Sequence, residues 1–286
     1  MRDWQNKMSL LIKLGIGEEP KEIVRPSFEE LVNTSINPKN ARANQLATTV
    51  RKEAEKLDQR YSFKYSFAIA LAYLGIGRSH DALVTLKEVG EFLPDLYVWD
   101  PFECPLKFVP VVASYAVLGK AEIAEQIMEK WNRITPKRWH YSPEFSLAYL
   151  AVNDYEKASE MIRSTLQAKD NLQPHYFDWR RSMLIEGRSG TIRFDPYLNA
   201  AFAISLFCLG EKDIAKKVVR GLESLDFDLE SGLICYRWHK DNINTSDIAA
   251  TALLSFAHSL IDEKEEELPR LQEGPKHPYR GLPQNV

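Results

Sequence analysis

Apolar residues recur at helical spacing along most of the chain, and the sequence has no long alternating runs of β-branched residues. Four segments share one order: a large apolar residue, a Gly or Asn four positions later, and an Ala five positions after that. These segments begin at Tyr73, Tyr115, Tyr149 and Leu206. The Gly or Asn suits a left-handed turn that ends one helix, and the small Ala lets the next helix approach closely. The pattern therefore predicts repeated helix–turn–helix hairpins.

The spacing of the turn residues resembles that of tetratricopeptide repeats in the middle of the chain. The turn residues are Gly77, Gly119, Asn153 and Gly210, followed by Ala82, Ala124, Ala158 and Ala215. Gly119 and Asn153 lie 34 residues apart, which is the period of that family. Pro94 and Pro136 each follow a turn glycine by 17 residues, where that family ends its second helix. The other two steps, of 42 and 57 residues, break the period.

The last hairpin carries a second resemblance. Gly232 is followed four positions later by Tyr236, and the loop leads to Asp-Ile-Ala-Ala-Thr-Ala-Leu-Leu at 247–254. This combination resembles repeats of the α/α-toroid families, which include terpenoid cyclases, protein prenyltransferases and six-hairpin glycosidases. The resemblance implies an enzyme whose hairpins close into a ring around a central cavity. The helix expected at 247–260 is apolar enough to be buried, which favours closure.

These patterns predict an all-α fold of repeated antiparallel helical hairpins. A closed (α/α) toroid is favoured, and a tetratricopeptide-like superhelix is the alternative. We expect a single domain over residues 1–262. The remainder, 263–286, is first acidic and then rich in proline, which is typical of an extended or disordered tail.

Four of the six tryptophans stand beside an acid or a histidine at an expected helix start or loop. The pairs are Trp99-Asp100, Trp139-His140, Asp178-Trp179 and Trp238-His239. If the inner helices of a ring begin near these pairs, their first turns converge on one rim of the cavity. Aromatic faces there would stabilise cations or stack on sugar rings. Carboxyls buried among them would have raised pKa values and could act as general acids.

The hypothesis assigns catalytic roles to four residues and substrate contacts to eight. The catalytic candidates are Asp100, His140, Glu144 and Asp195. The substrate-binding candidates are Trp99, Trp139, Tyr141, Asp178, Trp179, Tyr197, Trp238 and His239. The competing interpretation is structural: Asp100, Asp195 and Asp247 would be helix N-caps, and the aromatic side chains would pack the hairpins together.

Three functions are compatible with these patterns. The favoured one is a terpenoid-cyclase-like enzyme that protonates an alkene or epoxide of an isoprenoid-type substrate. The second is a glycosidase-like toroid that uses two of its own carboxyls to act on an intracellular oligosaccharide. The third is a non-enzymatic, tetratricopeptide-like scaffold that binds a peptide or protein partner in a groove.

Composition and short motifs argue against several other kinds of partner and site. A net charge of −3 over 286 residues makes nucleic acid a poor partner for this chain. Three cysteines that form no Cys-x-x-Cys pair argue against a disulfide framework or a structural zinc site, so we expect no metal and a cytoplasmic location. Gly75-Ile-Gly77 is interpreted as a helix-ending turn and no phosphate loop is recognised, so we expect no cofactor. The short apolar run near the amino terminus predicts no membrane span.

Overall fold

The structure is a computed structural model that describes residues 26–56, 68–90, 104–134, 143–168, 175–188, 191–225, 227–234 and 245–261. These residues are mostly helical, as the hydrophobic pattern predicts. The helices are α2 (Phe28–Ser35), α3 (Ala41–Ala54), α5 (Ser79–Gly90), α6 (Cys104–Val117), α7 (Ala121–Ile134), α8 (Phe145–Ala151), α9 (Tyr155–Gln167), α10 (Pro196–Cys208), α11 (Lys212–Glu223) and α12 (Thr245–Leu260). A further helical segment covers residues 68–75.

The four predicted turns lie at the predicted residues. Gly77, Gly119, Asn153 and Gly210 have φ angles of 75°, 69°, 60° and 90°, all in the left-handed region. Each turn closes with the same pair of hydrogen bonds. At the first turn, Arg78 N–H donates to Tyr73 O (2.8 Å) and Gly77 N–H donates to Leu74 O (3.0 Å). This Schellman arrangement satisfies carbonyls that the end of a helix otherwise leaves unpaired. Pro94 and Pro136 lie outside the described residues.

The predicted close approach of the second helix of each hairpin is also confirmed. Ala82, Ala124, Ala158 and Ala215 are each 0% exposed. A larger side chain at these positions would push the two helices of the hairpin apart, because protein interiors are close-packed.

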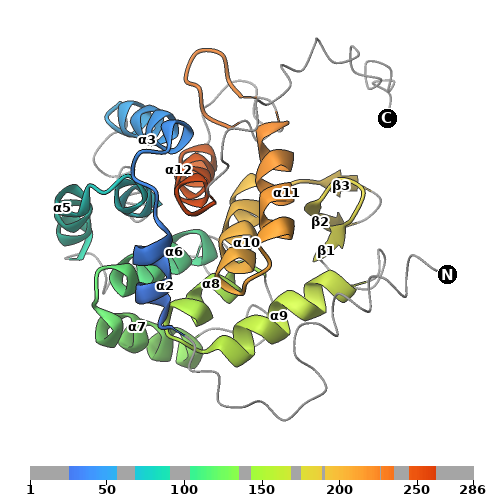
Figure 1. Cartoon of the computed structure of the whole chain (residues 1–286), viewed down its shortest axis with the longest axis horizontal. Coiled ribbons are helices and arrows are strands. Elements are labelled where there is room, and N and C mark those ends of the chain that lie inside the picture. Colours follow the sequence, from blue (N-terminus) through green and yellow to red (C-terminus); the bar gives the residue numbers. More distant parts are fainter. Residues whose placement is uncertain are drawn as a thin grey trace.

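Two kinds of helix alternate along the chain. The segment 68–75 and α6, α8, α10 and α12 are buried on almost every side over the part whose side chains are described, and we call them the inner helices. By contrast, α3, α5, α7, α9 and α11 bury one face and expose the other, and we call them the outer helices. Figure 1 shows the outer helices α3, α5, α7 and α9 at the periphery of the molecule. A helix that is apolar all round is stable only when other elements cover it completely.

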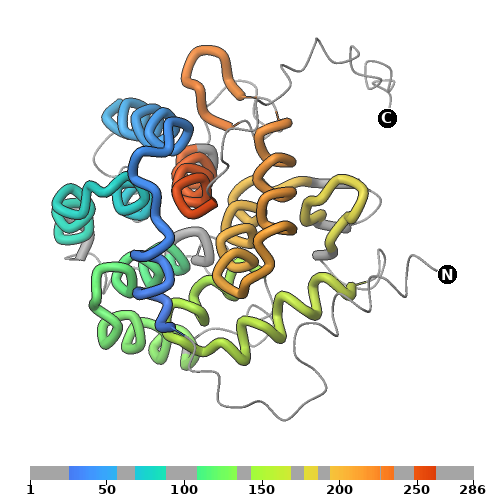
Figure 2. Tube along the Cα trace, viewed as in Figure 1, coloured from blue at the N-terminus to red at the C-terminus, as the bar shows by residue number. Residues whose placement is uncertain are grey.

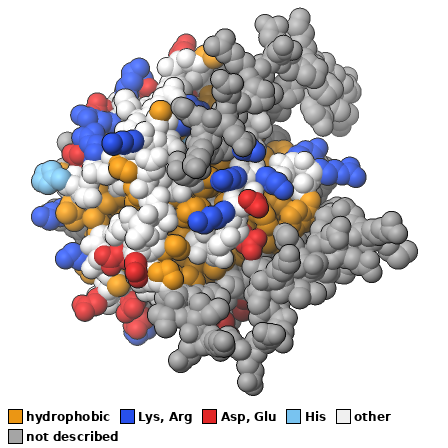
Figure 3. Space-filling view, in the orientation of Figure 1, with side chains coloured by type: hydrophobic (Ala, Val, Ile, Leu, Met, Phe, Trp, Pro, Cys, Tyr) orange, Lys and Arg blue, Asp and Glu red, His pale blue; other side chains and the backbone are white. Residues whose placement is uncertain are grey.

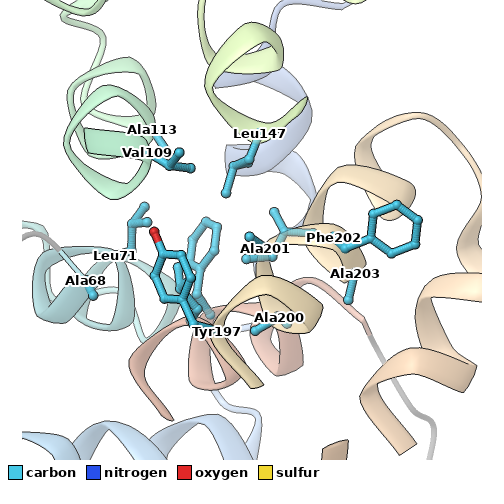
Figure 4. Close-up of a cluster of buried hydrophobic side chains, with 14 of the residues drawn as sticks. Ala68, Leu71, Val109, Ala113, Leu147, Tyr197, Ala200, Ala201, Phe202 and Ala203 are labelled. Carbon is cyan, nitrogen blue, oxygen red and sulfur yellow. The ribbon is translucent and has the colours of Figure 1, made fainter. Parts of the chain in front are cut away.

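The inner helices contact one another. Helix α10 packs between α8 and α12, and α8 also packs against α6. The segment 68–75 approaches α12 so closely that a Cβ added to Gly75 would lie 2.6 Å from Ser259 Oγ. Ala68 and Leu71 of the same segment share a buried cluster with side chains of α6, α8 and α10 (Figure 4).

Residues 26–40 lie across the carboxyl ends of the inner helices, as the tube in Figure 2 shows in dark blue. Phe28 N–H donates to Asn153 Oδ1 (2.8 Å), just beyond α8. Asn37 N–H donates to Ser259 O (2.7 Å), in the last turn of α12. Helix α2 also packs against α6 and α10. Because one short segment contacts the ends of these helices, the inner helices run in the same direction, with their amino ends on the opposite side.

An antiparallel sheet between α9 and α10 is the main departure from the all-α prediction. Its strands are β1 (His175–Asp178), β2 (Met183–Arg188) and β3 (Thr191–Arg193), in the order β1-β2-β3. The buried side chain of Asn199 on α10 hydrogen-bonds to the backbone of β2 in the way that a neighbouring strand would. Its Oδ1 accepts from Leu184 N–H (2.7 Å), and its Nδ2 donates to Leu184 O (3.1 Å). Strands this short give little periodic signal, and the contact with Asn199 exists only after folding.

The surface in Figure 3 carries basic and acidic side chains together, in keeping with the small net charge. Within the described part of the chain, no helix is both long and apolar enough to span a membrane. Cys208 is a free thiol, and burial raises its pKa to about 12. The predicted tail at 263–286 lies outside the residues that the structure describes.

Candidate functional site

Five of the predicted site residues can be placed. Glu144 immediately precedes α8, Asp195 and Tyr197 begin α10, and Asp178 and Trp179 adjoin the sheet. The others lie outside the described residues and stay predictions: Trp99, Asp100, Trp139, His140, Tyr141, Trp238 and His239. Glu144, Asp195 and Tyr197 lie at the amino ends of α8 and α10, the side of the molecule opposite residues 26–40.

Tyr197 is the centre of this site. It is 2% exposed, and Figure 4 shows its hydroxyl directed toward the region of Leu71 and Val109. Burial raises the pKa of Tyr197 well above its usual value, and the negative charges of Glu144 and Asp195 raise it further. The phenol therefore stays neutral and keeps a proton to donate.

Glu144 is a buried carboxyl, 6% exposed. It occupies the N-cap position of α8 with a helical backbone, and within the described first turn its side chain accepts no capping hydrogen bond. It precedes Leu147 by one turn, and residues three apart share a helix face. Leu147 belongs to the cluster around Tyr197 (Figure 4), so Glu144 lies on the face of α8 that points toward that cluster.

Asp195 has a structural role, as the capping interpretation predicted. Its side chain accepts from Leu198 N–H (3.2 Å) and caps α10, and Pro196 follows at the first helical position. The backbone carbonyl of Asp195 accepts from Asn199 Nδ2 (2.9 Å). These contacts fix the carboxylate at the amino end of α10, where the helix dipole favours negative charge.

Asp178 and Trp179 lie at the turn between β1 and β2. Asp178 Oδ1 accepts from Arg180 N–H (2.8 Å), and Asp178 Oδ2 pairs with Arg181. Burial alone would raise the pKa of Asp178, but hydrogen bonds from Arg181 and Arg180 outweigh it and lower the pKa. Arg181 is thus engaged in the turn between β1 and β2. Trp179 is 37% exposed and meets the edge of Phe177, with ring centroids 4.9 Å apart.

Sequence reasoning missed two polar contacts of the buried helices. Ser146 Oγ and Ser205 Oγ are 2.8 Å apart, which joins α8 to α10 in a buried hydrogen bond. His258 lies buried on α12 with its Nε2 2.8 Å from Glu223 Oε1. The sequence signal for both was a polar residue on an otherwise apolar helix, but it did not reveal the partners.

The comparisons with known proteins give no relative for this chain. No protein-family model matches it, and neither a curated protein nor a solved structure matches it.

Proposed function

We propose that this protein is an enzyme that performs acid–base chemistry on an isoprenoid-type substrate at the amino ends of its inner helices. The observation that carries the proposal is that the buried carboxyl of Glu144, the capping carboxyl of Asp195 and the buried phenol of Tyr197 all lie at the amino ends of α8 and α10. Two carboxyls and a neutral phenol in apolar surroundings are groups that can donate a proton and stabilise the positive charge that results.

The proposed architecture is a closed (α/α) toroid. It is supported by the alternation of buried and amphipathic helices and by the contact of the segment 68–75 with α12, which links the first inner helix to the last. It is supported also by residues 26–40, which cover the carboxyl ends and leave the amino ends as the side from which a substrate would enter. The Trp pairs that lie outside the described residues precede α6, α8 and α12 in the sequence, so the proposal assigns them to this entrance.

In the proposed reaction, the Glu144 carboxyl donates its proton to an alkene or epoxide of the substrate. The cation that forms closes on a second double bond of the same molecule. Loss of a proton from the cyclised cation back to the Glu144 carboxylate then restores the acid. The Asp195 carboxylate stabilises the positive charge, and the Tyr197 hydroxyl positions the reacting group. His140, Asp100 and the aromatic pairs remain further candidates in this scheme.

An apolar substrate is favoured over a sugar by the side chains around Tyr197. Leu71, Val109, Ala113, Leu147 and Ala201 belong to this cluster, and all are buried and apolar (Figure 4). Carbon side chains complement an isoprenoid chain, whereas a sugar needs several hydrogen-bonding groups for its hydroxyls. The glycosidase-like alternative rests on the presence of two carboxyls alone.

The tetratricopeptide-like scaffold stays the second candidate. The observation in its favour is that the four hairpin turns share one hydrogen-bonding pattern, which a stack of similar hairpins would require. A scaffold of this kind would bind a peptide and would catalyse nothing, so an activity assay separates the two proposals.

The test is turnover by the purified chain of a panel of isoprenoid alkenes, epoxides and diphosphates, with products identified by gas chromatography and mass spectrometry. An oligosaccharide panel is run in parallel. On the active substrate we expect Glu144→Gln to lower kcat by about 100-fold or more, the usual effect of losing a general acid. Glu53→Gln is the matched control, because Glu53 is also a buried carboxyl but pairs with Lys56 on α3. Full activity of E144Q, or no turnover on either panel, contradicts the proposal.

A further inference from the structure

Three aromatic rings stack where α6 and α8 begin and α7 ends. The centroid of Trp131 lies 4.5 Å from that of Phe108 and 5.1 Å from that of Phe145, with interplanar angles of 25° and 20°. Phe145 follows Glu144 directly in the chain. The stack therefore adjoins the amino ends of the inner helices, next to the proposed general acid.

The indole N–H of Trp131 has no acceptor among the residues that the structure describes, although the side chain is only 3% exposed. It is the one buried side-chain nitrogen or oxygen in that part of the chain without a hydrogen bond. Buried polar groups are nearly always paired, because burial removes the water that would otherwise bind them. An indole nitrogen only donates, so the missing partner must be an acceptor.

We propose that Trp131 Nε1 donates a hydrogen bond to a neutral oxygen of the bound small molecule, an alcohol, epoxide or carbonyl attached to an apolar chain. This inference rests on the proposed function and names a feature of its substrate. A neutral oxygen suits the position because Phe108 and Phe145, which both pack against the indole, carry no charge to balance an anion. The aromatic faces would contact the carbon chain beside that oxygen.

The arrangement gives Trp131 a role distinct from that of Glu144. Glu144 supplies the proton, whereas Trp131 selects molecules that carry an oxygen and orients them. Losing the N–H should therefore change which molecules bind, and losing the carboxyl should change whether they react. The two predictions fail independently.

The test measures binding of geraniol and of the hydrocarbon with the same carbon skeleton but no hydroxyl, by equilibrium dialysis with the full chain. We expect the wild type to prefer geraniol by about tenfold, which corresponds to about 1.4 kcal/mol for one hydrogen bond. Trp131→Phe should abolish this preference and leave the affinity for the hydrocarbon within about twofold, since phenylalanine preserves an aromatic ring against Phe108 and Phe145.

Two controls make the result specific. Tyr115→Phe removes a half-buried hydroxyl at the other end of α6 and should keep the preference. Glu144→Gln should also keep it, even where turnover is lost, so a failure of the proposed chemistry does not decide this inference.

Indole N–H resonances of the wild type give a second measurement that needs no variant: one resonance should shift with geraniol and not with the hydrocarbon. Equal binding of the two molecules by the wild type, binding of neither, or a preference retained in W131F overturns the inference.

Discussion

Arg42 and Glu223, 181 residues apart in the chain, form a two-bond ion pair that joins α3 to α11. Arg42 Nε lies 2.9 Å from Glu223 Oε1, and Arg42 Nη2 lies 2.6 Å from Glu223 Oε2. The same carboxylate meets His258 Nε2 on α12 at 2.8 Å, and the guanidinium lies 5.0 Å from the ring centroid of Phe227. One half-buried carboxylate therefore connects an early helix to the last two.

This contact predicts a pH dependence of stability. Burial alone would raise the pKa of Glu223, but hydrogen bonds from His258 and Arg42 outweigh it and lower the pKa to about 2. Because the folded pKa lies below the unfolded value, the stabilisation is complete above about pH 4.5 and is lost as the pH falls toward 2. We expect Glu223→Gln to lower the free energy of unfolding by about 2–3 kcal/mol at pH 7, and the difference from wild type to shrink through this window.

Urea unfolding at several pH values measures the difference. Glu129→Gln serves as control, since Glu129 pairs with Arg133 on an exposed surface and should contribute less than about 1 kcal/mol. A difference between E223Q and wild type that stays constant from pH 7 to pH 3 would show that the carboxylate is not held as the structure indicates.

Gly75 provides a test of the contact between the segment 68–75 and α12. An added Cβ would lie 2.6 Å from Ser259 Oγ and 3.1 Å from a ring atom of Phe256. We expect Gly75→Ala to destabilise the protein by about 1–3 kcal/mol, the usual cost of overpacking. Ser259→Ala in the same chain should recover part of this loss, because it removes the nearer atom. Additive effects of the two substitutions in a double-mutant cycle would contradict the close approach.

Capping and catalysis by Asp195 can be separated with two variants. Asn caps a helix about as well as Asp, so Asp195→Asn should keep the unfolding free energy within about 0.5 kcal/mol, whereas Asp195→Ala should lose about 1 kcal/mol. If the charge acts in the reaction, D195N should nevertheless lose at least about tenfold in kcat. Thermal unfolding and kcat are measured on both variants. Full activity in D195N would leave Asp195 with the capping role alone.

Asn199 should be intolerant of an isosteric change. Its Nδ2 donates to the carbonyls of Leu184 and Asp195, and an aspartate there can donate neither bond. We expect Asn199→Asp to cost about 3 kcal/mol, since it leaves buried carbonyls beside a new negative charge. Hydrogen exchange at the Leu184 amide should accelerate in parallel. Asn44→Asp, on the outer helix α3, is the matched control. An equal loss of unfolding free energy in both variants would contradict the buried hydrogen bonds from Asn199 to Leu184 and Asp195.

The local part of the fold could be predicted from the sequence because its causes are local. A residue that readily adopts the left-handed backbone conformation is needed wherever a Schellman turn ends a helix. For this reason Gly77, Gly119, Asn153 and Gly210 predicted where the hairpins turn. The alanines after the turns were predictable for a similar reason, since only a small side chain allows two helices to approach. The capping role of Asp195 also follows from its immediate neighbours, Pro196 and Leu198.

The candidate site was predictable only in part. Glu144, Asp195 and Tyr197 stood out as polar or aromatic residues near helix starts, and the structure places all three at the amino ends of α8 and α10. No pattern in the sequence separated them from Asp178 and Trp179, which lie at the turn of a sheet that the helical pattern did not predict. No sequence pattern set Trp131 apart from the other apolar residues of α7.

The sequence by itself determined the helical hairpins, their turns and the small residues at their closest contacts, because each depends on a few neighbouring residues and the backbone angles they allow. The tertiary structure alone decided that Arg42 meets Glu223, that Asn199 holds β2, that residues 26–40 cover the ends of the inner helices, and that the indole of Trp131 is buried without a partner. These contacts join residues whose separation in the chain carries no periodic signal, and their energies arise from burial and pairing that exist only in the folded molecule.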